Sequence, residues 1–200
     1  MTDPAANTCT AFAGTKRICS GSLSAVALQA KALSDRGESA PVLIFDDATA
    51  NLIDVDYRGS RDDVLKSLLH ELPQQERTPE TLRGPGRPRL GVVAREVTLL
   101  PRHWQWLSSQ PGGASVALRK LVDEARKANI GKDRIRQSQE AAYRFMSAMA
   151  GDAPGFEEAA RALFAGDEHR FEQCVGAWPE DVRDHAKRFA REALRNHSGA

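Results

Sequence analysis

The hydrophobic and polar positions near the start of the chain predict short strands. Residues 9–20 have an extended pattern, and Gly14-Thr15 supplies a turn that would divide them into two strands. Pro41–Asp46 is almost continuously apolar, whereas Leu52–Tyr57 alternates between apolar and polar positions. Because a short polar loop joins these two segments, we predict that they form a β-hairpin.

The same region predicts two helices. Apolar residues at helical spacing follow Ser22, which is a candidate N-cap, and Gly37 is the candidate stop. The segment Ser60–Asp63 resembles a capping box and precedes a second apolar stripe. We therefore expect a small α+β unit over residues 9–72, preceded by a disordered N-terminus over residues 1–8.

The pattern changes in the second half of the chain. Residues 73–90 contain four prolines and two glycines, a composition that predicts a stiffened linker. The domain that follows, residues 91–197, begins with a predicted strand over Gly91–Leu100 and a short helix that starts at Pro101. Amphipathic helices fill the rest. In the first of them, Ala114–Lys127, the residues expected to face inward are Leu118, Leu121, Val122 and Ala125.

The expected fold class is therefore α+β. A small N-terminal unit of strands and helices, which includes the hairpin, is followed by a Pro/Gly/Arg linker and a mostly helical C-terminal region.

Charge is distributed unevenly along the chain, although its net charge is only +1. Between Arg83 and Arg136, twelve Lys and Arg stand against four Asp and Glu, which gives this stretch a net charge of +8. The remaining residues hold sixteen basic and twenty-three acidic side chains, a net charge of −7. This separation favours a polyanionic partner, or contact between a basic and an acidic part of one assembly.

Several classes of function lack their sequence signals. The apolar runs are far shorter than the ~20 residues of a membrane span, and Met1–Cys9 has no secretory pattern, so we expect a cytoplasmic protein without a membrane partner. The three cysteines have no metal-type spacing, the histidines form no HExxH motif, and the glycines form no phosphate loop. We therefore predict no catalytic residue, no cofactor and no metal ligand.

One acidic cluster offers an alternative to this prediction. Asp46, Asp47, Asp54 and Asp56 surround the predicted hairpin, and four neighbouring carboxylates could hold Mg²⁺ or Ca²⁺ in an enzyme. Alternation of acidic and apolar residues is also what any half-exposed strand shows, and we favour that interpretation.

The basic stretch contains two patterns that are typical of DNA binding. Gly86–Arg89 resembles the core of an AT-hook, which lies in the minor groove, although Pro85 stands where that motif has a basic residue. The order of strand, helix, glycine turn and helix over residues 94–127 resembles a ribbon-helix-helix unit. That resemblance implies that Ser115 and the neighbouring amides hold phosphate. The alternatives are a solvated linker and a helical hairpin used for packing.

Three longer stretches carry a family resemblance: VLIFDDATANLIDVDYRGS (42–60), residues 86–127, and AGDAPGFEEAARALFAGD (150–167). They are similar to the bacterial domain-of-unknown-function family 2239. The resemblance implies a bacterial cytosolic protein and carries over no activity and no catalytic residue.

Our leading hypothesis is a non-catalytic, dimeric protein that associates with double-stranded DNA and has a regulatory role. The residues expected to contact the nucleic acid are Arg87, Arg89, Arg95, Arg102, Ser115, Arg119 and Lys120. The alternative is a protein–protein adaptor, in which the basic region docks on acidic surfaces and binds no nucleic acid.

Overall fold

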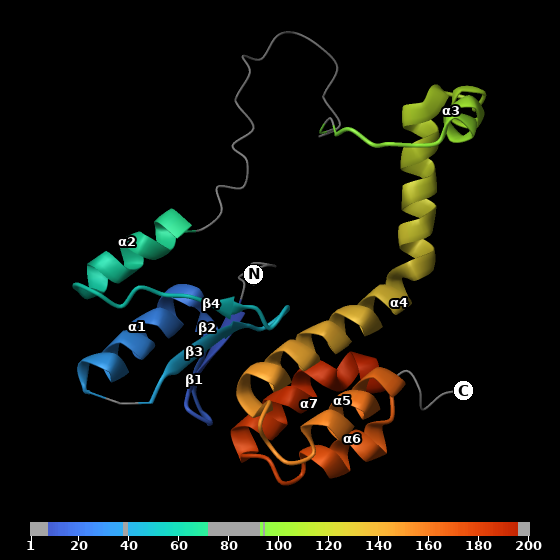
Figure 1. Cartoon of the computed structure of the whole chain (residues 1–200). Helices are drawn as coiled ribbons and strands as arrows, with labels where there is room; N and C mark the ends of the chain where they lie inside the picture. Colours follow the sequence, from blue (N-terminus) through green and yellow to red (C-terminus); the bar gives the residue numbers. More distant parts are fainter. Residues whose placement is uncertain (1–7, 38–39, 72–92, 94, 196–200) are drawn as a thin grey trace, which may run out of the picture. The chain divides into compact units, whose positions relative to one another are not determined.

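The computed structural model describes residues 8–37, 40–71, 93 and 95–195 (Figure 1). The chain divides into two compact units. Residues 1–73 and 132–200 form the first unit, and residues 74–131 form the second. The predicted linker over residues 73–90 lies outside the described residues, so its boundaries stay a prediction.

A four-stranded antiparallel sheet organises the first unit. Its strands are β1 (Thr8–Ala13), β2 (Lys16–Ser22), β3 (Val42–Asp46) and β4 (Leu52–Ile53), in the order β2-β1-β3-β4. Both predicted hairpins are confirmed. β4 is shorter than the expected Leu52–Tyr57 because only its first two residues pair with β3.

Two helices pack on one face of this sheet, as the sequence predicts. In α1 (Leu23–Asp35), the Ser22 hydroxyl accepts a hydrogen bond from the backbone N–H of Ala25. In α2 (Arg61–Glu71), the N–H of Ser60 donates to Asp63 Oδ2 at 2.9 Å, and the N–H of Asp63 donates to Ser60 Oγ. The capping box is therefore formed. The small core beneath the two helices contains Cys9, Ala11, Val26, Ala27, Ala30, Ile44, Val55, Val64 and Leu68.

A helical bundle packs on the other face of the sheet. It consists of the second half of α4 (Gly113–Ala150), α5 (Phe156–Ala165), α6 (Glu168–Val175) and α7 (Glu180–Arg195). Phe12 and Phe45 reach from the sheet to Phe145 of α4, with ring centroids 5.4 Å and 5.0 Å apart. Aromatic packing thus joins residues that are distant in the sequence, and the α+β class is confirmed.

The second unit contains α3 (Pro101–Ser108) and residues 113–131 of α4. We expected a helix over Ala114–Lys127 and a separate apolar stripe from Ile135, but α4 runs through both as one helix of 38 residues. No proline interrupts it. Its central Gly131 costs only about 1 kcal/mol relative to Ala, which does not end a helix.

The predicted strand over Gly91–Leu100 is wrong for its described part. Val93 and residues 95–100 have no regular secondary structure, and the four-stranded sheet does not include them. A strand needs a neighbouring strand for its backbone groups, and the described residues of a single chain supply none here.

A candidate nucleic-acid interface on the basic arm

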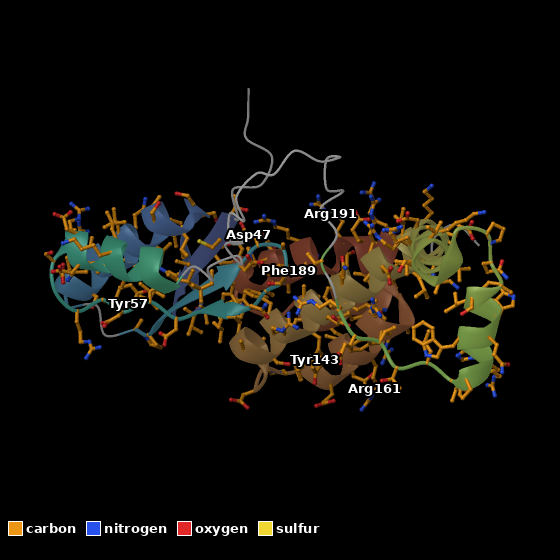
Figure 2. All side chains as sticks on the ribbon, turned by 90° about the horizontal axis from the view of Figure 1, so that it is seen from above. Asp47, Tyr57, Tyr143, Arg161, Phe189 and Arg191 are labelled. Atoms are coloured by element: carbon orange, nitrogen blue, oxygen red, sulfur yellow. The ribbon has the colours of Figure 1, made fainter. Side chains whose placement is uncertain are left out.

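We call residues 95–131 the basic arm. Its cationic side chains are exposed, and Figure 2 shows the side chains of α3 and α4 as sticks on the ribbon. On α4, Arg119 and Arg126 are seven residues apart, as are Lys120 and Lys127. Seven residues are almost two helical turns, so each pair lies on one side of the helix, separated by about 10 Å. The arm therefore presents two short cationic rows to solvent.

Five of the arm's cations lack internal partners among the described residues. Within the described part of the chain, these five residues have no ion pair and no side-chain hydrogen bond: Arg102 on α3, and Arg119, Lys120, Arg126 and Lys127 on α4. The four on α4 remain unpaired although Asp123 and Glu124 lie between them on the helix. Exposed cations without internal partners remain available for an external anion.

The cations of the first unit differ. Arg161 and Arg170 both pair with Glu158, and Lys187 pairs with Glu172 at 3.0 Å. The bundle therefore neutralises much of its charge internally, whereas the five arm cations named above are not neutralised by a described side chain.

The remaining predicted contact residues have varied positions. Ser115 is exposed in the first turn of α4, after Gly112 and Gly113, whose φ values of 83° and 75° form the turn into the helix. Arg95 is exposed, in a segment without regular structure. Arg87 and Arg89 lie outside the described residues. Phosphate binding by these side chains stays a prediction.

The apolar face of the arm contradicts one expectation. We expected Leu118, Leu121, Val122 and Ala125 to face inward, but Leu121, Val122 and Ala125 are exposed and Leu118 is half-buried. Leu107 is the one buried hydrophobic residue among the described residues of the arm. The physical reason is that the described residues of the second unit bury only Leu107, so they supply little core against which this face could pack.

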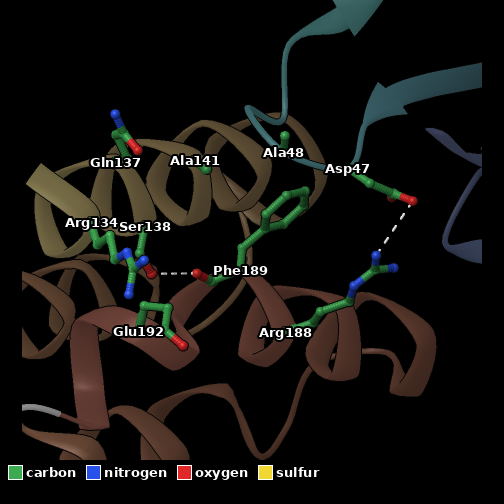
Figure 3. Close-up of a pocket in the computed structure, with 9 residues that line it drawn as sticks. All are labelled: Asp47, Ala48, Arg134, Gln137, Ser138, Ala141, Arg188, Phe189 and Glu192. Atoms are coloured by element: carbon green, nitrogen blue, oxygen red, sulfur yellow. Dashed lines mark hydrogen bonds and ion pairs between the residues drawn. The ribbon is translucent and has the colours of Figure 1, made fainter. Parts of the chain in front are cut away.

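The first unit contains a groove where the β3–β4 loop meets α4 and α7 (Figure 3). Its volume is about 430 Å³, and it is lined by Asp47, Ala48, Arg134, Gln137, Ser138, Ala141, Arg188, Phe189 and Glu192. Two acidic and two basic side chains balance each other, so the groove has no strong preference for an anion or a cation. It is a weaker candidate for a polyanion than the basic arm.

Asp47 is the best connected side chain of this groove. Its carboxylate accepts a hydrogen bond from Thr10 Oγ1 at 2.7 Å, and its other oxygen lies 3.4 Å from Arg188 Nη2. The side chain is 6% exposed, so these contacts compensate for most of its lost hydration. The pair joins the sheet to α7, which is a structural role.

His185 of α7 lies beside Asp47 and was missed by the sequence analysis. Its ring packs against Phe12, Phe145 and Phe189, and neither ring nitrogen has a hydrogen-bond partner among the described residues. Burial is the main reason that its pKa is lowered from 6.5 to about 4, and the nearby Arg188 contributes. The sequence could have indicated its burial, because His185 falls on the apolar stripe of α7.

Three of the four aspartates of the candidate metal cluster, Asp46, Asp47 and Asp56, have separate partners. The Asp46 carboxylate accepts hydrogen bonds from the N–H groups of Ala48 and Thr49 and so closes the β3–β4 loop. Asp56 binds Arg58, whose hydrogen bonds lower the pKa of Asp56 to about 2. Over the described residues, no group of three or more His, Cys, Asp or Glu could hold a metal ion.

Two further observations concern the described residues. The cysteines at positions 9, 19 and 174 are free. Among the described helices, none has the length and apolarity that crossing a bilayer would require.

Comparison with known proteins identifies a family whose model covers most of the chain. The model of a family described as an uncharacterised protein conserved in bacteria (DUF2239) matches residues 8–190. No curated protein and no solved structure matches the chain significantly.

Proposed function

We infer from the charges of the basic arm that this chain, which belongs to the bacterial DUF2239 family, is a non-catalytic protein that associates with double-stranded DNA. The proposal includes a regulatory role in the cytoplasm, where the chromosome of a bacterium lies. The observation that carries it is the set of exposed arm cations without an internal carboxylate partner among the described residues.

The arrangement of these cations supports a linear polyanion over a small anion. Arg119, Lys120, Arg126 and Lys127 extend over about 12 Å of one helix, and Arg102 lies on α3. A single phosphate would contact one or two of them, whereas a nucleic-acid backbone has a charge on every nucleotide. Release of counterions from DNA would then supply the binding free energy.

Fluorescence anisotropy with a labelled generic duplex tests the proposal. We expect a dissociation constant tighter than ~100 μM at ~50 mM salt, and affinity that falls steeply by ~200 mM salt. The double variant Arg119→Ala/Lys120→Ala should reduce the salt slope of log K by about one to two units, since each neutralised phosphate contributes about 0.9.

A matched control removes two cations that already have a partner. The variant Arg161→Ala/Arg170→Ala deletes the same amount of charge from exposed sites, but both arginines pair with Glu158. We expect its salt slope to equal that of the original protein. If the two double variants reduce the salt slope of log K equally, net charge alone determines binding and the arm has no specific role.

The adaptor hypothesis predicts a different result. If the basic arm docks on an acidic protein surface, the duplex will not bind at either salt concentration. That outcome would reject DNA association and leave the adaptor as the better proposal.

A further inference from the structure

We propose that the groove of the first unit binds a small organic monocarboxylate, whose charged group contacts Arg134 and whose apolar body lies on Ala141 and Phe189. This groove lies between the β3–β4 loop, α4 and α7 (Figure 3). None of the residues that line it belongs to the basic arm, so the inference goes beyond the proposed binding of DNA and does not rest on it.

Three segments that are distant in the sequence build the groove. On α4 the lining residues are at positions 134, 137, 138 and 141, and this spacing keeps their side chains on one face of the helix. The lining residues on α7 are at positions 188, 189 and 192, and the β3–β4 loop adds positions 47 and 48. The volume of about 430 Å³ lies within the range of about 300–1,000 Å³ that is usual for small-molecule sites.

The bottom of the groove is apolar and its rim is polar. Ala141 and Phe189 are only 2% and 8% exposed, so they form the bottom. Ser138 is buried beside them, but its hydroxyl is already hydrogen-bonded to backbone groups of α7. Arg134 and Gln137 are exposed at the rim. A molecule with an apolar body and one charged end matches this distribution.

The pairing of the charges in the groove selects an anion. Two acidic and two basic side chains balance by number, but three of these four interact within the chain. Asp47 and Arg188 form an ion pair at 3.4 Å, and Glu192 also has an interaction partner. Arg134 is exposed and has no ion pair or side-chain hydrogen bond among the described residues. Its guanidinium is therefore available, and it can bind a planar carboxylate through two parallel hydrogen bonds.

A carboxylate fits this groove better than a phosphate group does. Figure 3 shows Arg134 and Glu192 at one end of the groove and the Asp47–Arg188 pair at the other. A phosphate monoester has about 1.5 to 2 negative charges at pH 7, and the acidic side chain at each end would repel the second charge. A single negative charge balances Arg134 with less repulsion, so the groove favours a monoanion.

The walls of the groove are joined to one another, so the site is formed before a ligand binds. The Ser138 hydroxyl connects α4 to α7. The guanidinium of Arg144 donates to the carbonyl oxygen of Thr49 and connects α4 to the β3–β4 loop. The Asp47–Arg188 pair connects the same loop to α7. A ligand then binds without ordering these segments first, which lowers the free-energy cost of binding.

A buried polar side chain without a partner lies behind one wall of the groove. His185 is 2% exposed, and neither ring nitrogen has a hydrogen-bond partner among the described residues. It lies beside Asp47, which lines the groove. Such groups are rare in folded chains because they cost stability, and functional sites are where proteins retain them. This observation supports a functional site here independently of the charge on Arg134.

Nuclear magnetic resonance of the full chain tests the site, with 3-phenylpropanoate, 4-methylpentanoate and 2-naphthoate as probes. We expect at least one of these acids to bind with a dissociation constant of ~1 mM or tighter and to shift the amide signals of Ala48, Ala141 and Phe189. The neutral amide of the same acid should bind about tenfold more weakly, because it offers no charge to Arg134. Phenyl phosphate should bind more weakly than 3-phenylpropanoate.

A pair of arginine variants shows whether Arg134 holds the carboxylate. Arg134→Met removes the charge, keeps an unbranched side chain, and should weaken binding of the same acid about tenfold. The matched control is Arg136→Met, because Arg136 is also exposed on α4 but pairs with Asp133 at 3.0 Å and does not line the groove. Its affinity should equal that of the original chain, and the amide signals show whether each variant is folded.

Four results would overturn the proposal. They are the absence of binding by all three acids up to ~10 mM, shifted signals that lie outside the groove, tighter binding of phenyl phosphate, and an equal loss of affinity in the two arginine variants.

Discussion

Asp47 Oδ1 lies 3.9 Å from Nε2 of His185, at the contact between the sheet and α7. This distance is too long for a hydrogen bond, so the carboxylate raises the pKa of His185 by less than burial of the imidazole lowers it. Arg188 is bound to the same carboxylate and opposes a positive charge on His185. Aromatic rings enclose the remaining sides of the histidine. These surroundings favour a neutral ring.

The neutral state of His185 predicts how stability depends on pH. The pKa of its ring is about 4 in the folded chain and 6.5 in the unfolded chain, so the unfolded chain binds the proton first as the pH falls. The contribution to stability is complete above pH 6.5, is lost as the pH falls towards 4, and amounts to at most about 3 kcal/mol.

Urea unfolding at pH 7.5 and pH 4.5 measures this effect. The variant His185→Leu has a similar volume and cannot bind a proton, so it should lose less stability between the two pH values than the original chain. The variant His169→Leu is the control, because His169 is exposed and lies on α6. If the original chain and His185→Leu respond to pH equally, His185 is not the group that titrates.

Replacement of Asp47 should weaken the contact between the sheet and α7. Asp47→Ala leaves the guanidinium of Arg188 without this carboxylate and removes an acceptor from Thr10. We expect a loss of about 1–3 kcal/mol in the free energy of unfolding, the usual result of breaking a largely buried polar group from its partners.

The control for this change is Asp54→Ala, which removes an exposed aspartate from the same hairpin region. Surface substitutions of this kind usually change stability by less than about 0.5 kcal/mol. Equal stabilities of the Asp47 and Asp54 variants in urea would show that the buried carboxylate contributes nothing net.

Ser138 gives a third prediction, on the packing of α4 against α7. Its buried hydroxyl donates to the carbonyl oxygen of Phe189 at 2.5 Å and accepts from the N–H of Ala193 at 3.1 Å. Ser138→Ala keeps the helix propensity but leaves both backbone groups without this partner, so we expect a loss of about 1–3 kcal/mol. Thermal unfolding measures it, with Ser147→Ala on the exposed side of the same helix as control. A shift in melting temperature no larger than that of the control would contradict this role.

Local signals explain what the sequence could predict. The turn at Gly14-Thr15, the cap at Ser22 and the capping box at Ser60 depend on residues within a few positions of one another, and all three are formed. The α+β class follows from the same signals, because strand and helix patterns alternate only in the first part of the chain.

The features that the sequence could not predict depend on long-range contacts. The pairing of β1 with β3 and the contact of Phe12 with Phe145 join segments that no local pattern connects. The error at Gly91–Leu100 has the same origin, since its β-type composition leads to a strand only where another strand lies beside it. The position of His185 next to Asp47 likewise exists only in the folded unit.

The last prediction concerns two glycines with opposite surroundings. Gly131 lies within α4, has no φ in the left-handed region, and a Cβ there would meet nothing within 4 Å. Gly131→Ala should therefore stabilise α4 by about 0.5–1 kcal/mol, because alanine loses less backbone entropy in a helix.

Gly155 has φ of 83° before α5, and a Cβ there would lie 3.1 Å from the carbonyl oxygen of Cys174. Gly155→Ala should destabilise the bundle by more than 1 kcal/mol, since alanine is strained in this conformation. Circular dichroism during thermal unfolding measures both variants, and a loss of stability in Gly131→Ala would show that α4 is bent or broken at this position in solution.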